Sequence, residues 1–335
     1  MQNEKIAKKL QAILPFVEKP SRYIGGELGS ITKTHTPDRL LFALVSPEPY
    51  ELSSTTLSLQ ILYHIMNNQP WIACERAFAP WVDMSEKMRK NNIPLFSLET
   101  KTPLNKFDII GFSIHYELSY PNIFEMLSLS GIPFYSRDRD KSYPLIIAGG
   151  SCAYQPEPIA DIFDFIFVGD AEQDLIPILK TIKENKERDR KELLKMVAEF
   201  RGVYVPSLYQ PKYKDNDFIG VKPDKPVKAA ISYQLKSEYY PVLPPMPWTQ
   251  PVHDRYAVEI MRGCSRGCRF CEAGFIYRPL RERQVDTIIN QVLEGISNTG
   301  WETVNLFSLS TADYSGIDNL LEGIEQVSSA KKFSV

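Results

Sequence analysis

Short apolar runs alternate with longer amphipathic stretches through the first two thirds of the chain. Five runs have the length and composition of buried strands: residues 39–47, 72–78, 107–114, 144–150 and 163–170. Four stretches have the apolar spacing of helices: residues 57–68, 120–131, 156–162 and 171–185. Strands that alternate with helices form parallel sheets with helices on both faces. We therefore predict an α/β fold that begins with a doubly wound, Rossmann-like parallel sheet over residues 36–202.

The residues before this sheet, 1–35, are predicted to form an N-terminal helix and an extension. Ile6, Leu10, Ile13 and Leu14 fall on one side of that helix. The stretch lacks the apolar segment and cleavage site of a signal peptide, and no stretch of the chain approaches the roughly 18 consecutive apolar residues that a membrane-spanning helix needs. We expect a cytoplasmic protein without a membrane partner.

The pattern changes after the sheet. Residues 203–250 are rich in proline and show neither strand alternation nor a long helical stripe, so we predict an extended connector. In residues 251–335 a strand, a loop, a helix, a second strand, a second helix and the start of a third strand follow one another. A barrel of strands and helices takes about 200 residues or more. We therefore expect the first strands and helices of an incomplete (β/α) barrel, belonging to a longer protein.

The carboxyl ends of the predicted parallel strands should meet at one edge of the sheet, where open α/β sheets bind ligands. Gly149-Gly150 and Gly169-Asp170 stand at two of these ends, and paired glycines there also serve simply to make tight turns. Candidate residues that could line the crevice are Tyr116, Glu117, Tyr120 and Cys152, each with an alternative role in packing or capping. No G-x-G-x-x-G follows a strand, which argues against a dinucleotide site.

Three of the five cysteines fall within eight residues, which is typical of metal binding and not of a disulfide framework. Cys264, Cys268 and Cys271 follow the first strand of residues 251–335, with Gly263 and Gly267 among them. Thiolates at this spacing can hold one 4Fe-4S cluster and leave its fourth iron without a protein ligand. The glycines supply the backbone freedom that such a loop requires.

A structural zinc site is the main alternative for this loop. Closed zinc sites use four ligands, and no cysteine or histidine follows Cys271. His253 lies upstream, before the predicted strand, at the far end of the predicted barrel. The spacing therefore favours an open cluster over zinc, while Cys74 is expected to be a buried apolar side chain.

The cysteine loop resembles the signature of the radical S-adenosylmethionine (SAM) superfamily, with Phe270 in its aromatic position. The resemblance implies that the open iron binds SAM, whose reductive cleavage gives a 5'-deoxyadenosyl radical that abstracts a substrate hydrogen. It also implies that Phe270 lies near the SAM adenine, and that Ser308, Ser310 and Thr311 lie near its amino group. The chain departs from the family at the last site, because a Gly-Gly-Glu stretch is common there. Arg262, Arg266 and Arg269 are expected either to offset cluster charge or to lie on the surface.

Residues 22–30, 75–84, 111–123 and 147–170 resemble a mostly uncharacterised bacterial branch of radical SAM proteins that carry a cobalamin-binding-type domain. The histidine motif that ligates cobalt in many of these proteins, D-x-H-x-x-G, is absent. A glycine three residues later is missing after all four histidines, His35, His64, His115 and His253. We expect no histidine ligation of cobalt. Cobalamin binding stays open, since some relatives bind it without this motif.

The resemblance leaves the substrate unknown and implies a reducing protein, such as a flavodoxin or ferredoxin, as partner. A formal net charge of −2 gives no overall attraction to nucleic acid, and we find no basic stripe with interleaved aromatic residues. The alternative to a radical enzyme is an electron-transfer module, or a module that binds a corrinoid or a partner, without SAM chemistry.

Overall fold

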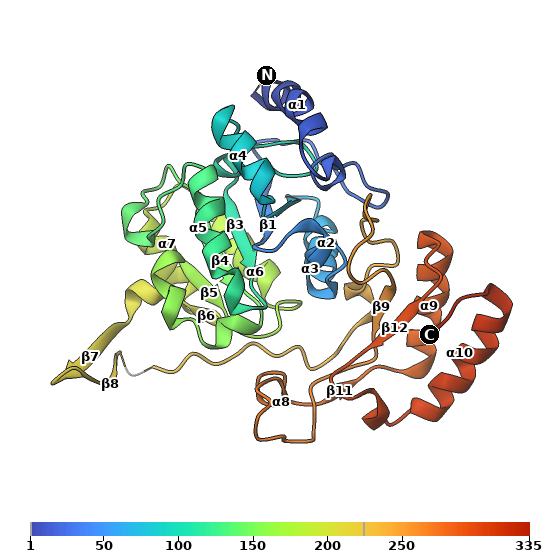
Figure 1. Cartoon of the computed structure of the whole chain (residues 1–335). Coiled ribbons are helices and arrows are strands. Elements are labelled where there is room, and N and C mark those ends of the chain that lie inside the picture. The colour runs from blue at the N-terminus through green and yellow to red at the C-terminus, as the bar shows by residue number, and fades with distance from the viewer. Residues whose placement is uncertain (1, 224) are drawn as a thin grey trace.

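A six-stranded sheet lies at the centre of the molecule (Figure 1). The computed structural model describes residues 2–223 and 225–335. The strand order is β2-β1-β3-β4-β5-β6, and the strands are β1 (Leu40–Ser46), β2 (Ile72–Phe78), β3 (Ile109–Ser113), β4 (Leu145–Gly149), β5 (Phe165–Phe167) and β6 (Val203–Tyr204). The first five are parallel, and β6 runs antiparallel to β5. The chain reverses its direction of strand addition between β1 and β3, which makes that point the switch point of the sheet.

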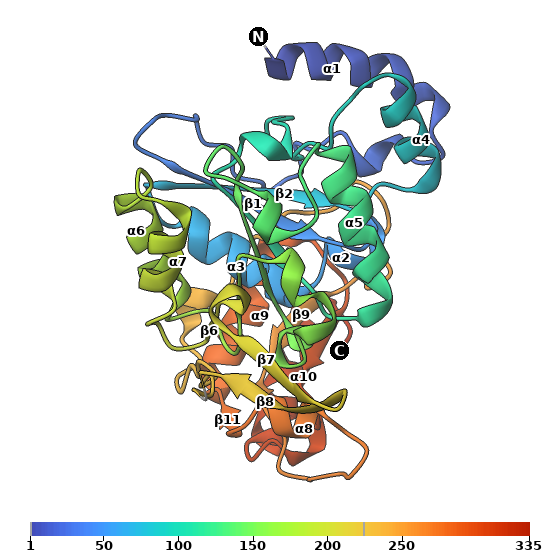
Figure 2. The same ribbon diagram turned by 90° about the vertical axis from the view of Figure 1, so that its left-hand side faces the viewer.

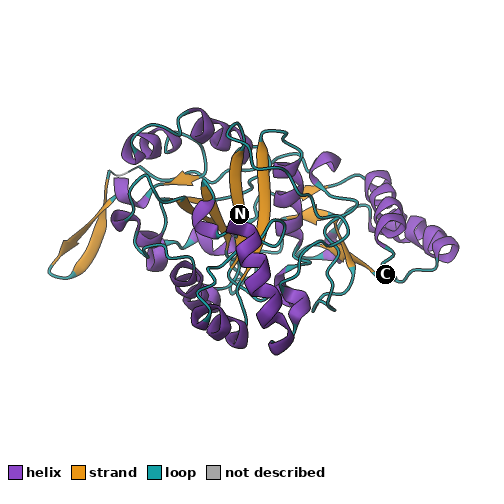
Figure 3. Cartoon of the chain, turned by 90° about the horizontal axis from the view of Figure 1, so that it is seen from above, coloured by secondary structure: helices purple, strands orange, loops and turns teal. Residues whose placement is uncertain are grey.

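Helices cover both faces of this sheet (Figure 2), so the predicted doubly wound fold is confirmed. One face packs against α1 (Gln2–Ile13), α4 (Val82–Lys90) and α5 (Tyr120–Leu129). The other packs against α3 (Leu57–Asn67), α6 (Leu175–Glu184) and α7 (Arg190–Val197). A short helix, α2 (Tyr50–Ser53), follows β1. Seen from above, the strands run between these helices (Figure 3).

The sequence of β1 shows why the sheet is buried on both sides. Ala43 and Val45 belong to the core under α1, α4 and α5, whereas Phe42 and Leu44 belong to the core under α3, α6 and α7. Successive side chains of a strand point to opposite faces, so a strand covered on both faces must be apolar at nearly every position. All four of these side chains are at most 3% exposed.

Two helix predictions need correction. Residues 156–162 were expected to form an α-helix, but Glu157–Ile162 is a 3-10 helix, since so short a segment can form few of the i→i−4 hydrogen bonds that stabilise an α-helix. Helix α4 was not predicted, because only Met84, Ser85 and Met88 of its nine residues are buried and the apolar stripe is correspondingly short.

The connector prediction is wrong for part of residues 203–250. Residues 203–204 form β6, and an antiparallel hairpin of β7 (Gln210–Lys214) and β8 (Asp217–Lys222) projects from the body of the molecule (Figure 1). Asp215 and Asn216 make its turn with positive φ, a conformation that Asp and Asn tolerate well. The hairpin is exposed on both faces, so its sequence lacks the apolar alternation of a half-buried strand.

Residues 256–333 build a third hydrophobic core beside the central sheet. Strand β9 (Tyr256–Glu259) pairs in parallel with β12 (Val304–Phe307), while β10 (Met261–Arg262) pairs with β11 (Arg281–Glu282). Helices α8 (Ala273–Ile276), α9 (Val285–Thr299) and α10 (Ile317–Lys331) complete this part. The predicted third strand appears as a single parallel bridge between Thr303 and Ser334. The predicted sequence of first barrel elements is therefore confirmed. Across the described residues, no helix is both long and apolar enough to cross a bilayer.

Candidate functional site

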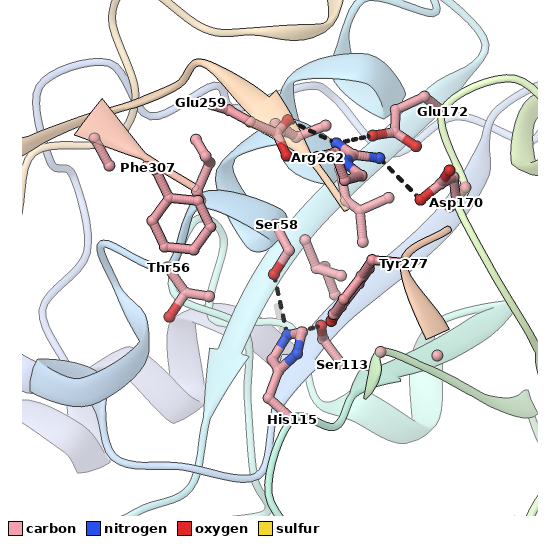
Figure 4. Close-up of a pocket in the computed structure, with 18 of the residues that line it drawn as sticks. Thr56, Ser58, Ser113, His115, Asp170, Glu172, Glu259, Arg262, Tyr277 and Phe307 are labelled. Carbon is pink, nitrogen blue, oxygen red and sulfur yellow. Dashed lines mark hydrogen bonds and ion pairs between the residues drawn. The ribbon is translucent and has the colours of Figure 1, made fainter. Parts of the chain in front are cut away.

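A cavity of about 870 Å³ lies between the carboxyl edge of the central sheet and the β9–β12 part of the chain (Figure 4). The sheet side supplies Ser113, His115, Gly149, Gly150, Gly169 and Asp170, and the other side supplies Glu259, Arg262, Gly263, Tyr277, Asn305 and Ser308. Apolar side chains such as Leu44, Met66, Phe167 and Phe307 make up most of the remaining wall. Ligand sites of about 300–1,000 Å³ are usually of this mostly apolar kind. The predicted crevice therefore exists, and residues from His253 onward form its opposite wall.

The glycines at the strand ends are required by close backbone contacts. Gly150 has φ +102°, and a Cβ there would lie 2.3 Å from the carbonyl oxygen of Ile114. Gly169 has φ +113°, and its Cβ would lie 2.1 Å from the carbonyl oxygen of Ala230. These positions thus serve tight packing as well as lining the cavity.

His115 is the histidine at the sheet side of the cavity. Its Nε2 lies 3.0 Å from Ser58 Oγ and 2.9 Å from Ser113 Oγ, and Figure 4 shows this group below the cavity's charged end. Burial lowers the pKa of His115, which keeps the ring neutral near pH 7. Because Nε2 contacts two hydroxyl groups, this nitrogen is engaged within the protein in this geometry.

The other crevice candidates are placed differently. Tyr116 lines the cavity, but Glu117 and Tyr120 do not. Cys152 is buried among apolar side chains of the sheet's core and is not part of the cavity wall, which agrees with its alternative role in packing. Burial raises the pKa of the neighbouring Tyr120 to about 12. Cys74 is 1% exposed on β2, as expected for an apolar core residue.

The charged end of the cavity is built around Arg262. This guanidinium lies 3.0 Å from Asp170, 2.7 Å from Glu172 and 2.8 Å from Glu259 (Figure 4). Burial alone would lower the pKa of Arg262, but Glu259, Glu172 and Asp170 raise it well above its ordinary value. Arg262 is thus a largely buried cation held by three carboxylates, which excludes the surface role stated as one alternative for it.

The cysteine loop runs from Gly263 to Leu280, between β10 and β11. Cys264 and Cys271 are half-buried, Cys268 is exposed, and all three are free thiols. A turn places the amide of Cys271 3.1 Å from the carbonyl oxygen of Cys268. Gly263 has φ +91°, with a Cβ position only 2.6 Å from the Tyr277 carbonyl oxygen, and Gly267 has φ +64°. The backbone thus needs glycine at both places, as the sequence suggested.

Three free thiols on one solvent-accessible loop are a donor set that suits iron–sulfur ligation. Within residues 2–223 and 225–335, no three His, Cys, Asp or Glu side chains are gathered closely enough to hold a metal ion. The three sulfur atoms would therefore have to draw together round a cluster. His253 lines the cavity and forms no such group with the cysteines.

Three of the residues predicted to contact SAM lie in the turn after β12. Ser308 lines the cavity and hydrogen-bonds Thr311, with 2.7 Å between the two hydroxyl oxygens. Ser310 donates a hydrogen bond of 2.7 Å to Asp313, which also forms an ion pair with Arg266 of the cysteine loop. The turn after β12 is thereby attached to the loop.

Phe270 is 93% exposed and lies outside the cavity wall. Arg269 is also exposed on the loop. Glu172, Glu259 and Arg281, whose charges surround Arg262 and Asp170, were not predicted as site residues. Only the Gly-Asp pair at a predicted strand end pointed toward this cluster.

Residues 58–206 match the family described as radical SAM proteins, N-terminal. This part of the chain is similar to the N-terminal part of radical SAM proteins. The match covers most of the central sheet, and the cysteine loop that follows it carries the superfamily spacing. The match supports the part of the resemblance that concerns the central sheet, and the cysteine loop lies outside the matched residues.

The chain is also similar to a curated relative and to solved structures. It is 29% identical over 244 residues to the uncharacterized protein MJ0966 of Methanocaldococcus jannaschii, covering 72% of this chain and 47% of that protein. Its fold matches the radical S-adenosylmethionine methyltransferase TsrM of Kitasatospora setae. One TsrM structure, with tryptophan substrate and a SAM analogue bound, gives a TM-score of 0.54 at 12% identity; another, with cobalamin and a [4Fe-4S] cluster bound, gives 0.52 at 13%.

Each TsrM match covers 87% of this chain and 52% of TsrM. The chain therefore spans about half the length of the relatives that it matches. At 12–13% identity the likeness establishes the fold: a Rossmann-like sheet followed by barrel elements.

Proposed function

We propose that Cys264, Cys268 and Cys271 ligate a 4Fe-4S cluster whose fourth iron binds SAM. The observation that carries the proposal is the three-thiol loop with no fourth cysteine, attached by its stems to the charged end of a large cavity. A three-thiolate set leaves one iron open, whereas structural zinc uses a closed set of four ligands. When bound and reduced, such a cluster supplies one electron that breaks the C5'–S bond of SAM, giving methionine and a 5'-deoxyadenosyl radical.

The residues of this chain would then bind and orient SAM. Ser308, Ser310 and Thr311 form the turn that Asp313 and Arg266 attach to the cysteine loop, so they are placed to meet a group bound at its open side. Phe270, exposed on the same loop, offers a ring against which an adenine can stack. Supply of the electron by a flavodoxin or ferredoxin belongs to the same proposal, and the substrate stays undefined.

The apolar cavity is the proposed site of a corrinoid. A large planar cofactor suits this cavity for three reasons. The cavity is large, it lies beyond the carboxyl ends of the parallel strands, and it adjoins the cysteine loop. The similar fold of TsrM, one structure of which contains cobalamin and a [4Fe-4S] cluster, supports the same reading. Since His115 Nε2 contacts Ser58 and Ser113, we propose that this nitrogen does not ligate cobalt.

Anaerobic reconstitution with iron and sulfide tests the cluster assignment. We expect about four iron atoms per chain and a brown protein, because a 4Fe-4S cluster contains four irons and absorbs visible light. Cys264→Ala, Cys268→Ala and Cys271→Ala should each lose most of this iron. Cys74→Ala removes a thiol of the central sheet and should retain it. Equal iron in Cys268→Ala and Cys74→Ala, or stoichiometric zinc in place of iron, would contradict the proposal.

A further inference from the structure

Asp170 stands where three segments of the chain meet. It lies three residues after the end of β5, its backbone amide donates to the carbonyl oxygen of Ala230 at 2.9 Å, and its Oδ2 accepts from the amide of Ser232 at 3.0 Å. Its side chain is 10% exposed. The same carboxylate also reaches the base of the cysteine loop, 92 and 111 residues further along the chain.

The base of the cysteine loop is a two-residue antiparallel ladder in which Arg262 lies opposite Arg281. Like charges at directly opposed positions destabilise such a pair unless a counter-charge lies between them. Asp170 supplies that charge to both arginines. Its Oδ1 accepts from Arg262 Nη1 at 3.0 Å, and its Oδ2 pairs with Arg281 Nη1. One carboxylate thus bridges the two stems of the loop that holds all three cysteines.

The two arginines depend on Asp170 to different degrees. Arg262 also pairs with Glu172 and Glu259. Arg281 is 7% exposed, and among the described residues Asp170 is the acid with which it forms an ion pair. Its other partners are carbonyl oxygens of Ser232, Tyr277 and Pro279. Removing the Asp170 charge would leave Arg281 as a buried cation without a counter-charge, which is strongly unfavourable.

We propose that Asp170 is a positioning residue for the cysteine loop: it fixes the distance between the loop's two stems and ties the loop to the end of β5. The part that concerns a cluster rests on the proposed function. The part that concerns the loop does not. Because Asp170 also lines the cavity, the same side chain links the cavity wall to the loop geometry.

Hydrogen exchange of the cluster-free chain tests the clamp by itself. In Asp170→Asn, we expect amides of residues 259–263 and 281–283 to exchange about tenfold faster or more, since a buried charge-assisted contact is lost at the ladder. Exchange in β3 and β4 serves as an internal reference, so general destabilisation is recognised and divided out. Asp161→Asn, the same change at an exposed position, should match the wild type. The proposal is overturned if, relative to β3 and β4, the stem amides of Asp170→Asn exchange at the wild-type rate.

Arg281→Gln provides a second test from the other partner. If Asp170 acts through Arg281, the double variant should exchange no more than about twofold faster than the faster single variant, because the two changes remove one interaction. If the two substitutions instead multiply each other's effect on the exchange rate, they act independently, and the proposed role of Asp170 is overturned. This comparison needs only folded single variants, and if Asp170→Asn does not fold, Arg281→Gln alone should speed the exchange of the same stem amides, because it removes the same ion pair from the other side.

Reconstituted protein tests the consequence for the cluster. We expect Asp170→Asn to shift the electron paramagnetic resonance (EPR) g values of the reduced cluster, with Asp170→Glu restoring them in part and Asp161→Asn leaving them unchanged. Wild-type g values in Asp170→Asn would contradict the positioning role. If the wild type itself assembles no cluster, the proposed function fails, whereas the exchange results still decide whether Asp170 holds the loop.

Discussion

Glu75 on β2 is a carboxylate with 1% exposure that is fully engaged by donors. It lies 2.5 Å from His35 Nε2 and accepts hydrogen bonds from Ser97 Oγ at 2.6 Å and Thr100 Oγ1 at 2.7 Å. Burial alone would raise the pKa of Glu75, but these three partners hold it below the ordinary value. The ionised form is therefore the one that the folded protein stabilises.

Replacing Glu75 by glutamine should lower the free energy of unfolding at pH 7 by about 1–3 kcal/mol, the range for a lost hydrogen bond to a buried charge. A depressed pKa contributes stability above the unfolded value and loses it as the pH falls through the folded value. The difference between wild type and Glu75→Gln should therefore shrink between pH 7 and pH 4. Urea unfolding at both values measures it, with exposed Glu117→Gln as control. A constant difference would argue against the ionised, hydrogen-bonded carboxylate.

At the scale of residues, sites defined by spacing along the chain could be predicted, whereas ion pairs between distant residues could not. The three cysteines were identified because their chemistry depends on neighbours within eight positions. The partners of Arg262 were not predictable in this way, since Asp170 lies 92 residues earlier and meets it only after two separate parts of the chain pack together. A sequence pattern records short-range order, whereas such ion pairs are set by tertiary structure.

Helix α1 packs its apolar side into the core of the central sheet, although it precedes the first strand by many residues. Ile6, Leu10 and Ile13 are 3–7% exposed and belong to the cluster that includes α4 and α5. Three of the four apolar positions expected on one side are thus buried, and Leu14 packs partly against the same cluster. The helix is consequently part of the cooperative core.

Leu10→Ala should lower the free energy of unfolding by about 2–5 kcal/mol, as expected for truncating a buried leucine. Lys8→Ala, on the exposed side of the same helix, should change it by less than about 0.5 kcal/mol. Denaturant unfolding monitored by far-ultraviolet circular dichroism gives both values. Equal midpoints for the two variants would show that α1 does not contribute to the stability of the sheet.

At the scale of elements, prediction succeeded where most apolar positions of an element pack against a core, and it missed α4, which buries three of its nine residues. The five parallel strands and α3, α5 and α6 carry the required apolar period because they pack against a core. The β7–β8 hairpin carries none, because water surrounds both of its faces. Its local sequence cue is the Asp215-Asn216 turn, and two residues are too few to predict a hairpin.

At the scale of the whole molecule, the cavity joins the sheet to the cysteine loop. The sequence predicted its sheet side from the strand ends, but the opposite wall, with Glu259, Tyr277 and Asn305, depends on how residues after 250 pack against the sheet. No period along the chain encodes that arrangement. The cavity could therefore be anticipated in position but not in extent or lining.

Filling the cavity should abolish the proposed corrinoid site. Gly149 lines it without a positive φ, and a Cβ there would meet its nearest neighbour, the Phe167 carbonyl oxygen, at an ordinary 3.7 Å. Gly149→Leu should thus place its side chain in the cavity and weaken hydroxocobalamin binding at least about tenfold, since the volume is occupied. Lys195→Leu, exposed on α7, should bind like the wild type. Equal retention of hydroxocobalamin by both variants after gel filtration would place the corrinoid elsewhere.

The most direct test of the radical SAM proposal is EPR of the reconstituted, reduced protein with and without SAM. An open iron predicts a cluster signal whose g values shift when SAM binds, and Cys268→Ala should give no such signal. A cluster signal that ignores SAM would contradict the proposed SAM site and favour an electron-transfer module. Absence of any cluster signal from the wild type, with zinc bound instead, would contradict the cluster assignment itself.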